Sequence, residues 1–312
     1  MEDMDQNFPA IAMDLGVSPN VDERPTVVAK IIASLAVSKP AKAACQGAPE
    51  TKILDGHFHL NRLLGGQATV SDMLQMPLPR APNGDGELTG GVWSSVIRII
   101  RRAVHVSRFA AAVGLHPKHA TRWNNQQVQA FRCLQRTPHT KVLGEVGIAL
   151  SARDVPMQEQ VLQSLLRRFA DPARPVILHL RGRKGREDEV YNRAFKLVSP
   201  ILSREQPILL HCFSGGTDIF QNGVRDFLTP TPATRGWCLF SQTAKTQGLR
   251  EVPSDRLLFE RDAPYLFTLG KGTDNTPHHN EDVAALVANA RQGAVTEVVA
   301  AANGNLRSLF QL

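Results

Sequence analysis

The stretch KILDGHFHL, residues 52–60, carries the two features from which the fold and the chemistry follow. Its first residues are apolar, as in a parallel strand that is buried on both faces. Its end carries His57 and His59, and residues two apart on a strand point to the same side. The two imidazoles can therefore face one metal ion. An isolated pair of this kind is only a weak indication, because two surface or hydrogen-bonded histidines would have the same spacing.

Short apolar runs recur downstream and alternate with amphipathic segments. The runs are GVWSSVI, FAAAVGLHP, KVLGEVGIAL, PVILHL, PILLHCF, GWCLFS and DRLLFERDAPYL. Helical periodicity lies over residues 124–135, 157–170, 188–198 and 218–227. Eight strands alternating with helices are typical of either a closed parallel barrel or a doubly wound sheet. Several strands carry a histidine or a carboxylate near the C-terminal end, where barrel active sites lie, so we predict an α/β fold of the (β/α)8 TIM barrel type.

Two parts of the chain differ from this pattern. Residues 1–50 mix acidic, amide, proline and alanine residues, and they predict a poorly ordered N-terminal extension. The barrel domain is expected over residues 51–312. Within it, residues 61–90 are rich in glycine and proline and predict an insertion, either a flexible loop or a small helical insert that ends in a loop.

The overall composition narrows the class of protein. The chain of 312 residues has a formal net charge of +7, which fits an anionic partner such as DNA or RNA. The acidic N-terminus resembles no secretory signal, and no apolar stretch is long enough to span a bilayer. We therefore expect a cytoplasmic or nuclear protein, monomeric and without a membrane partner. The four cysteines form no CxxC pair, so neither a disulfide framework nor a cysteine-based zinc site is expected.

Three further strands carry polar residues at matching positions. Glu145 lies within VLGEVGI, where a carboxylate is costly to bury unless it pairs with an arginine or binds metal. His179 and His211 end the runs PVILHL and PILLHCF. One such histidine is more often a hydrogen-bonded core residue than a ligand, but two on successive strands indicate a shared site.

The last apolar run adds two carboxylates, Glu260 and Asp262, which period two would place on one face. Asp262 precedes Ala-Pro, where the strand should end, and could ligate a metal, activate its water or simply cap the loop. Imidazoles and carboxylates together suit divalent ions such as Mg, Mn or Zn, and a bridging carboxylate would suit a pair of ions about 4 Å apart. The predicted metal ligands are His57, His59, Glu145, His179, His211 and Asp262.

These residues lie in motifs that resemble the TatD-like metal-dependent hydrolases, within the amidohydrolase-type barrels. The motifs are DGHFHL, GLHP, GEVG, PVILHLRG, LLHCFSGG, ERDAPYL and NGNLRSLF, in the order of the family. The resemblance implies two divalent ions and deoxyribonuclease activity, often 3′-to-5′ on single strands. It places His57, His59 and Asp262 on one ion, His179 and His211 on the other, Glu145 between them, and His116 and Arg181 at the substrate phosphate. Asp262 and Glu145 are then the catalytic residues.

The chain departs from the family pattern at three positions. Asn61 and Ala149 stand where the family has aspartate, and Arg261 stands in the middle of its ETD motif. Arg261 would add a cation near the metals, which would either weaken them or hold phosphate. The departures bear on rate, metal preference and substrate orientation.

A basic run, LRGRKGR over residues 180–186, follows His179 and fits either phosphate contacts or a solvated loop. The leading hypothesis is a hydrolase that cleaves nucleic-acid phosphodiesters with metal-activated water, as a 3′-5′ exonuclease. One alternative is a small-molecule amidohydrolase or phosphotriesterase-type enzyme, because the same ligands serve several hydrolyses. Such enzymes often bridge their metals with a modified lysine, so Glu145 favours the nuclease. The other alternative is a barrel that binds nucleic acid with little activity.

Overall fold

A computed structural model of the chain describes most of the predicted barrel. The residues described are 51–59, 86–95, 109–136, 140–214, 219, 236–240, 249–250, 252–266, 275, 277 and 280–310. The predicted extension over 1–50, the loop up to residue 85 and nearly all of the helix over 218–227 lie outside these residues. The domain boundaries therefore stay predictions.

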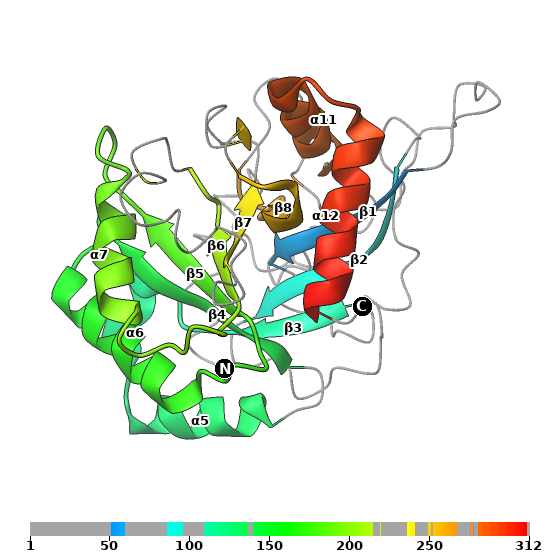
Figure 1. Ribbon diagram of the computed structural model, residues 1–312. Helices are drawn as coiled ribbons and strands as arrows, with labels where there is room; N and C mark the ends of the chain where they lie inside the picture. The colour runs from blue at the N-terminus through cyan, green and yellow to red at the C-terminus, as the bar shows by residue number, and fades with distance from the viewer. Residues whose placement is uncertain are drawn as a thin grey trace, which may run out of the picture.

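The described strands form one parallel sheet of eight, in which the spatial order follows the chain order. The strands are β1 (Thr51–Phe58), β2 (Gly86–Ser95), β3 (Phe109–Val113), β4 (Thr140–Ala149), β5 (Val176–Arg181), β6 (Ile208–His211), β7 (Gly236–Phe240) and β8 (Leu257–Phe259). The sheet curls so that its last strand returns to its first (Figure 1). There the N–H of Asp262 donates to the carbonyl of His57 at 3.0 Å, and the N–H of His59 donates to that of Ala263 at 2.7 Å. The predicted α/β barrel is confirmed.

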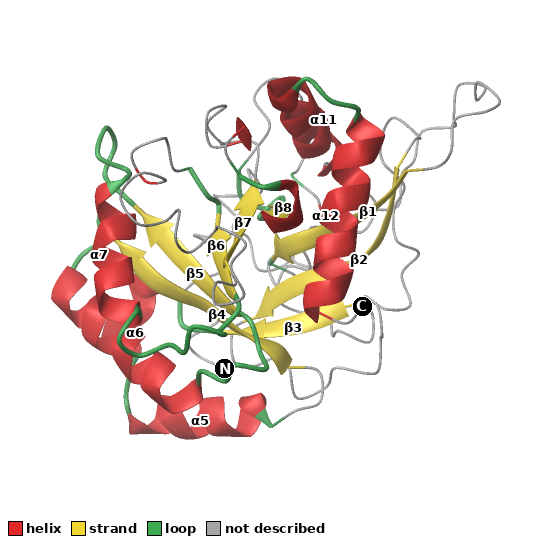
Figure 2. Cartoon of the chain, viewed as in Figure 1, coloured by secondary structure: helices red, strands yellow, loops and turns green. Residues whose placement is uncertain are grey.

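The helices lie outside the curled sheet (Figure 2). Those described are η3 (Pro117–Arg122), α5 (Asn125–Gln135), α6 (Val155–Phe169), α7 (Glu189–Val198), η5 (Ser254–Arg256), α11 (Asn280–Arg291) and α12 (Val295–Phe310). The three predicted helices that fall on described residues correspond to α5, α6 and α7. Their starts follow local capping chemistry, since Asn124 Oδ1 accepts from the Gln127 N–H at 3.0 Å and Asp154 Oδ1 accepts from the Met157 N–H at 3.2 Å. Among the described residues, no helix combines the length and apolar composition needed to cross a membrane.

Burial follows the period of each element. The apolar stripe of α6, including Val161, Leu162 and Leu165, packs in the larger apolar cluster between helices and sheet. Ile177 of β5 and Leu209 of β6 belong instead to a second cluster. Because side chains alternate along a strand, His179 and His211, two residues further on, lie on the same face as Ile177 and Leu209. The sheet thus directs both histidines toward the interior at the C-terminal ends of their strands.

Two strand boundaries differ from the predictions. β2 begins at Gly86, inside the predicted loop 61–90, because its first residues pair with β1 from Thr51 onward. β8 ends at Phe259, and Asp262 has φ 52°, in the left-handed region. Regular strand geometry therefore ends before Glu260 and Asp262, but both carboxylates still reach the ring of His211, Glu260 at Nδ1 and Asp262 at Nε2.

Candidate metal centre

Glu145 lies at the centre of the polar cluster, at the C-terminal ends of the strands. Its Oε1 is 3.2 Å from Nε2 of His57 and 3.3 Å from Nε2 of His59. Its Oε2 is 2.8 Å from Nδ1 of His179 and 3.4 Å from Nε2 of His211. This one carboxylate, 4% exposed, thus contacts four histidines that lie in or directly after β1, β5 and β6. The alternative of a buried salt bridge between Glu145 and an arginine is not what the structure shows.

Asp262 completes the cluster from the other side. Its Oδ1 lies 3.1 Å from Nε2 of His59, 3.7 Å from Nε2 of His211 and 3.9 Å from Nε2 of His57. The backbone bond from Asp262 to His57 holds this carboxylate against the end of β1. The structure therefore brings all six predicted ligands together, although their role as ligands stays a prediction.

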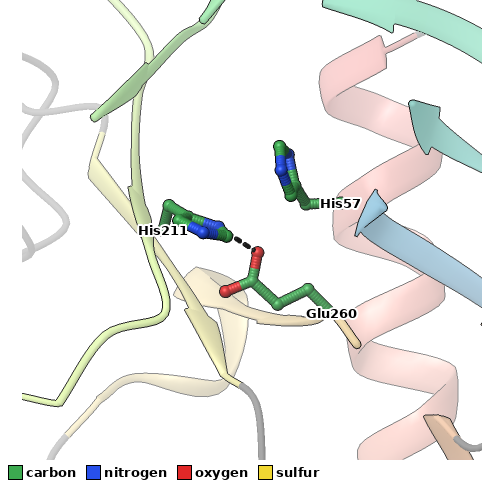
Figure 3. A group of neighbouring side chains, drawn as sticks. All are labelled: His57, His211 and Glu260. Atoms are coloured by element: carbon green, nitrogen blue, oxygen red, sulfur yellow. Dashed lines mark hydrogen bonds and ion pairs between the residues drawn. The ribbon is translucent and has the colours of Figure 1, made fainter. Parts of the chain in front are cut away.

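Glu260 belongs to the cluster, although the sequence analysis gave it no role. It is fully buried, and its Oε2 lies 2.8 Å from Nδ1 of His211 (Figure 3). Its other oxygen accepts from the backbone N–H of Cys212. Since Nδ1 of His211 is held by Glu260, Nε2 is the nitrogen that faces Glu145 and Asp262. A carboxylate behind a histidine in this way orients the ring and raises its basicity as a ligand.

Asp55 links the end of β1 to the segment that follows β8. Its Oδ1 accepts from the N–H of His57 at 2.9 Å and from the N–H of Arg261 at 3.4 Å. Burial raises the pKa of Asp55 well above its ordinary value. The DGH motif does not predict the bond between Asp55 and the N–H of Arg261, because the two residues lie about two hundred positions apart in the sequence.

Arg261 is buried and contacts interior residues. Its side chain is 1% exposed, and Nε donates to Oδ1 of Asn275 at 2.8 Å. Asn275 in turn donates to the carbonyl of Arg261 at 2.9 Å. Burial lowers the pKa of the guanidinium, and the charges of Asp282 and Asp55 oppose that effect. Of the two effects considered for Arg261, holding phosphate does not fit a side chain this buried, which contacts interior partners instead.

The charges of the cluster are set by burial and by mutual contact. Burial raises the pKa of Glu145, but the imidazoles around it outweigh this and hold the pKa well below its ordinary value. Burial also raises the pKa of Asp262, and His211 with His59 reverse this. For His59 burial lowers the pKa, and Glu145 with Asp262 raises it above the ordinary value; for His211 burial lowers it, and Cys212 with Glu260 raises it well above that value. For His179 burial prevails, and the pKa is lowered.

The cluster fits a divalent metal. His57 is fully buried; its Nδ1 has no hydrogen-bond partner among the described residues, and its Nε2 lies 3.2 Å from Glu145 Oε1 without the geometry of a hydrogen bond. A buried nitrogen without a partner is costly, and a coordinated cation would supply that partner. Four groups of three residues offer ligand atoms that all lie within 4.8 Å of one another, as the ligands of one metal ion do. Two of the groups are His57 with His59 and Asp262, and His116 with Glu145 and His179. The other two are His57 with His211 and Glu260, and His211 with Cys212 and Asp262.

The two predicted phosphate-binding residues lie at different depths. The ring centroid of His116 is 4.3 Å from that of His179, so His116 borders the cluster. Burial, together with the charge of His179, lowers the pKa of His116 to about 3. Nδ1 of His116 accepts from the N–H of Lys118 at 3.1 Å, which begins η3. Arg181 is exposed at the end of β5, two residues beyond His179.

The motifs on these strands match a known family over most of the chain. The family model described as TatD related DNase matches residues 55–311. The chain belongs to the TatD-related DNase family. It is similar to proteins named 3′-5′ ssDNA/RNA exonuclease TatD. That of Erwinia amylovora is 28% identical over 219 residues, covering 67% of this chain and 80% of the relative. That of Edwardsiella piscicida is 30% identical over 211 residues, covering 65% and 78%.

Solved structures of TatD-family proteins share the fold. A TatD homologue from Escherichia coli K12 superposes with a TM-score of 0.64 at 21% identity, covering 83% of this chain and 98% of the homologue. A TatD-family hydrolase from Entamoeba histolytica gives a TM-score of 0.60 at 15% identity, covering 84% and 99%. The chain is therefore a TatD-family hydrolase with a barrel fold and a buried cluster of histidines and carboxylates at the strand ends.

Proposed function

We propose that this protein is a divalent-metal-dependent nuclease that hydrolyses phosphodiester bonds of single-stranded nucleic acid, working as a 3′-5′ exonuclease. The observation that carries the proposal is the position of Glu145, whose two oxygens contact four imidazoles while Asp262 faces three of them. A carboxylate shared in this way suits a pair of cations. The names of the TatD relatives support the choice of nucleic acid as substrate.

The proposed histidine ligands divide into two groups according to which oxygen of Glu145 they contact. His57, His59 and Asp262 would hold one ion, His179 and His211 the other, and Glu145 would bridge them. Such ions act as Lewis acids, activating water and neutralising the charge that develops on phosphate.

The chain's own residues would do the rest. Asp262, ionised and held beside His59, can orient a water molecule and accept its proton. Glu260 fixes the ring of His211. His116 is neutral, and Nδ1 already accepts a hydrogen bond from Lys118, so its proton lies on Nε2. That nitrogen can donate to a phosphate oxygen, and Arg181 at the rim can hold the next one.

The decisive variant is Glu145→Gln, which keeps the shape of the side chain and removes its charge. We expect loss of oligonucleotide cleavage on the order of 1,000-fold, together with weaker metal binding. The assay follows an end-labelled single-stranded oligonucleotide with Mg, Mn, Zn and Co in turn. Glu159→Gln on α6 is the matched control, because Glu159 pairs only with Arg193 at the surface among the interactions described.

Two results would contradict the proposal. One is cleavage by purified, folded Glu145→Gln protein at the rate of the unaltered chain. The other is hydrolysis of simple esters or lactams without hydrolysis of oligonucleotides, which would favour the small-molecule alternative. Oligonucleotide binding with no cleavage above the Glu145→Gln background would favour the alternative of a binding protein.

A further inference from the structure

Beyond β5 the chain forms a compact basic turn at the rim of the centre. The N–H of Arg186 donates to the carbonyl of Arg183 at 2.9 Å, which closes a four-residue turn. Gly185 has φ 80°, as the third residue of a type II turn requires. The side chains of Arg183, Lys184 and Arg186 are all exposed. We call residues 183–186 the cationic turn.

The cationic turn is fixed in place by its surroundings. Nε of Arg183 donates to the carbonyl of Leu150, in the loop after β4, at 3.4 Å. The N–H of Gly185 donates to Oε1 of Glu187 at 2.9 Å. Arg186 lies 3.4 Å from Glu189, but the Arg186 side chain is 68% exposed, so solvent weakens this ion pair. The positive side chains are therefore held at one place on the surface.

The position of the turn relative to the metal centre limits what it can bind. Arg183 lies four residues beyond His179, up to about 13 Å at roughly 3.3 Å per extended residue. The turn is therefore close enough to the centre to contact a neighbouring phosphate of a strand whose scissile phosphate lies at the centre. A second basic element borders the centre: η3, whose N-cap His116 lies next to His179, exposes Lys118 and Arg122 and contains no acidic residue.

An exposed aromatic ring at the centre favours a nucleic acid over other polyanions. Tyr265 is 40% exposed, and its ring centroid is 5.0 Å from that of His59. Aromatic rings at such positions stack on bases, and stacking is available only in a single strand. A polyglutamate chain or an anionic membrane has no base to place there.

We propose that the cationic turn and η3 bind the phosphates of nucleotides next to the scissile one, so that the protein recognises a single-stranded polynucleotide and not an isolated phosphodiester. This proposal rests on the proposed nuclease function for the site, and it adds the part of the surface that selects a polymeric substrate.

The test uses the full chain with EDTA, so that binding is measured without cleavage. The probe is a fluorescent single-stranded oligothymidylate of twelve nucleotides. The variant is Lys184→Gln with Arg186→Gln, and the control is Arg132→Gln with Arg136→Gln. That control removes the same charge from the C-terminal end of α5, which runs away from the rim.

We expect the turn variant to bind the oligonucleotide about tenfold more weakly in low salt, with the control within about twofold of the unaltered protein. The slope of log affinity against log salt should fall by about 1.4, which is about 0.7 for each of two lost phosphate contacts. Equal binding by the turn variant, or an equal loss in the control, would overturn the proposal. So would binding of polyglutamate or of anionic phosphatidylserine vesicles as tightly as the oligonucleotide.

Failure of the nuclease proposal can be told apart from failure of this one. Hydrolysis of bis(p-nitrophenyl) phosphate by the unaltered protein reports on the centre, because this small diester has no second phosphate for the turn to bind. Its absence would count against the nuclease, whereas the binding comparison in EDTA would still decide the role of the turn.

Discussion

Glu260 acts on the centre only through His211. Its carboxylate accepts from both His211 Nδ1 and the N–H of Cys212, so each oxygen has a donor. In Glu260→Gln one of these oxygens becomes an NH2 group. Two hydrogen-bond donors then face each other, the new NH2 group and either His211 Nδ1 or the N–H of Cys212. We expect metal affinity to fall by about 10- to 100-fold, measured by competition with a chelating dye.

A purely structural role for Glu260 would show a different pattern. Glu260→Gln would then lower the free energy of unfolding of the metal-free protein and leave metal affinity unchanged. Chemical unfolding with EDTA therefore accompanies the metal titration. Unchanged affinity in a folded variant would remove Glu260 from the positioning of the ligand.

The histidines of the cluster predict that metal binding releases protons. Burial lowers the pKa values of His59 and His211, but neighbouring groups outweigh it and raise both above the ordinary value. In the metal-free protein these rings therefore keep their protons to a higher pH than a free imidazole does, and an ion binds only the deprotonated ring. We expect metal affinity to increase as the pH rises above about 6.5 and to decrease below it. Calorimetry in two buffers of different ionisation enthalpy counts the protons, and a count of zero would contradict the assignment.

At the scale of elements, the end of β4 is attached to α6 by one buried side chain. Oε1 of Gln158 accepts from the N–H of Ala149 at 2.8 Å, and Nε2 donates to the carbonyl of Arg153 at 2.8 Å. Within β4, Gly147 lies so close to β5 that an added Cβ would be 2.1 Å from the carbonyl oxygen of His179. These contacts hold Glu145 at its depth in the sheet.

Gln158→Met tests this attachment. The variant keeps the volume of the side chain but leaves the buried N–H of Ala149 without an acceptor. We expect the free energy of unfolding to fall by about 1–3 kcal/mol, measured by urea denaturation. Gln129→Met on the exposed face of α5 should change it by less than about 0.5 kcal/mol. Equal stability of Gln158→Met and the unaltered protein would show that the β4–α6 junction does not depend on this amide.

The strands and the six converging residues could be predicted because a buried parallel strand is apolar on both faces, so a polar residue at its end stands out. Glu145 and His179 are of this kind. The contact between Glu260 and His211 could not be predicted, because it depends on how β6 and β8 meet in space. The partner of Arg261 could not be predicted either, because its guanidinium bonds to Asn275, fourteen positions further along the chain, while its neighbours Glu260 and Asp262 face His211.

At the scale of the whole molecule, the C-terminal helices hold the strand that begins the barrel. Oδ1 of Asn303, on α12, accepts from the N–H of Leu54 at 3.0 Å. Nδ2 of Asn280, at the start of α11, donates to the carbonyl of Leu54 at 3.1 Å. The register of β1 against β2 shifts between Ile53 and Leu54, so these side chains contact β1 where its pairing is irregular. Residues from the two ends of the described chain thus set the position of β1, which carries His57.

Replacing Asn303 should therefore affect both stability and the metal centre. Asn303→Leu removes the acceptor of a buried N–H, and we expect the free energy of unfolding to fall by about 1–3 kcal/mol. Because β1 also carries His57 and ends at His59, metal affinity should fall as well, although α12 contributes no predicted ligand. Gly304→Ala is the control: residue 304 is exposed, an added Cβ there meets nothing within 4 Å, and the change should stabilise α12 by up to about 1 kcal/mol. A loss of stability in Asn303→Leu with metal affinity intact would mean that the ligands on β1 are positioned without α12, by Asp55 and the strands alone.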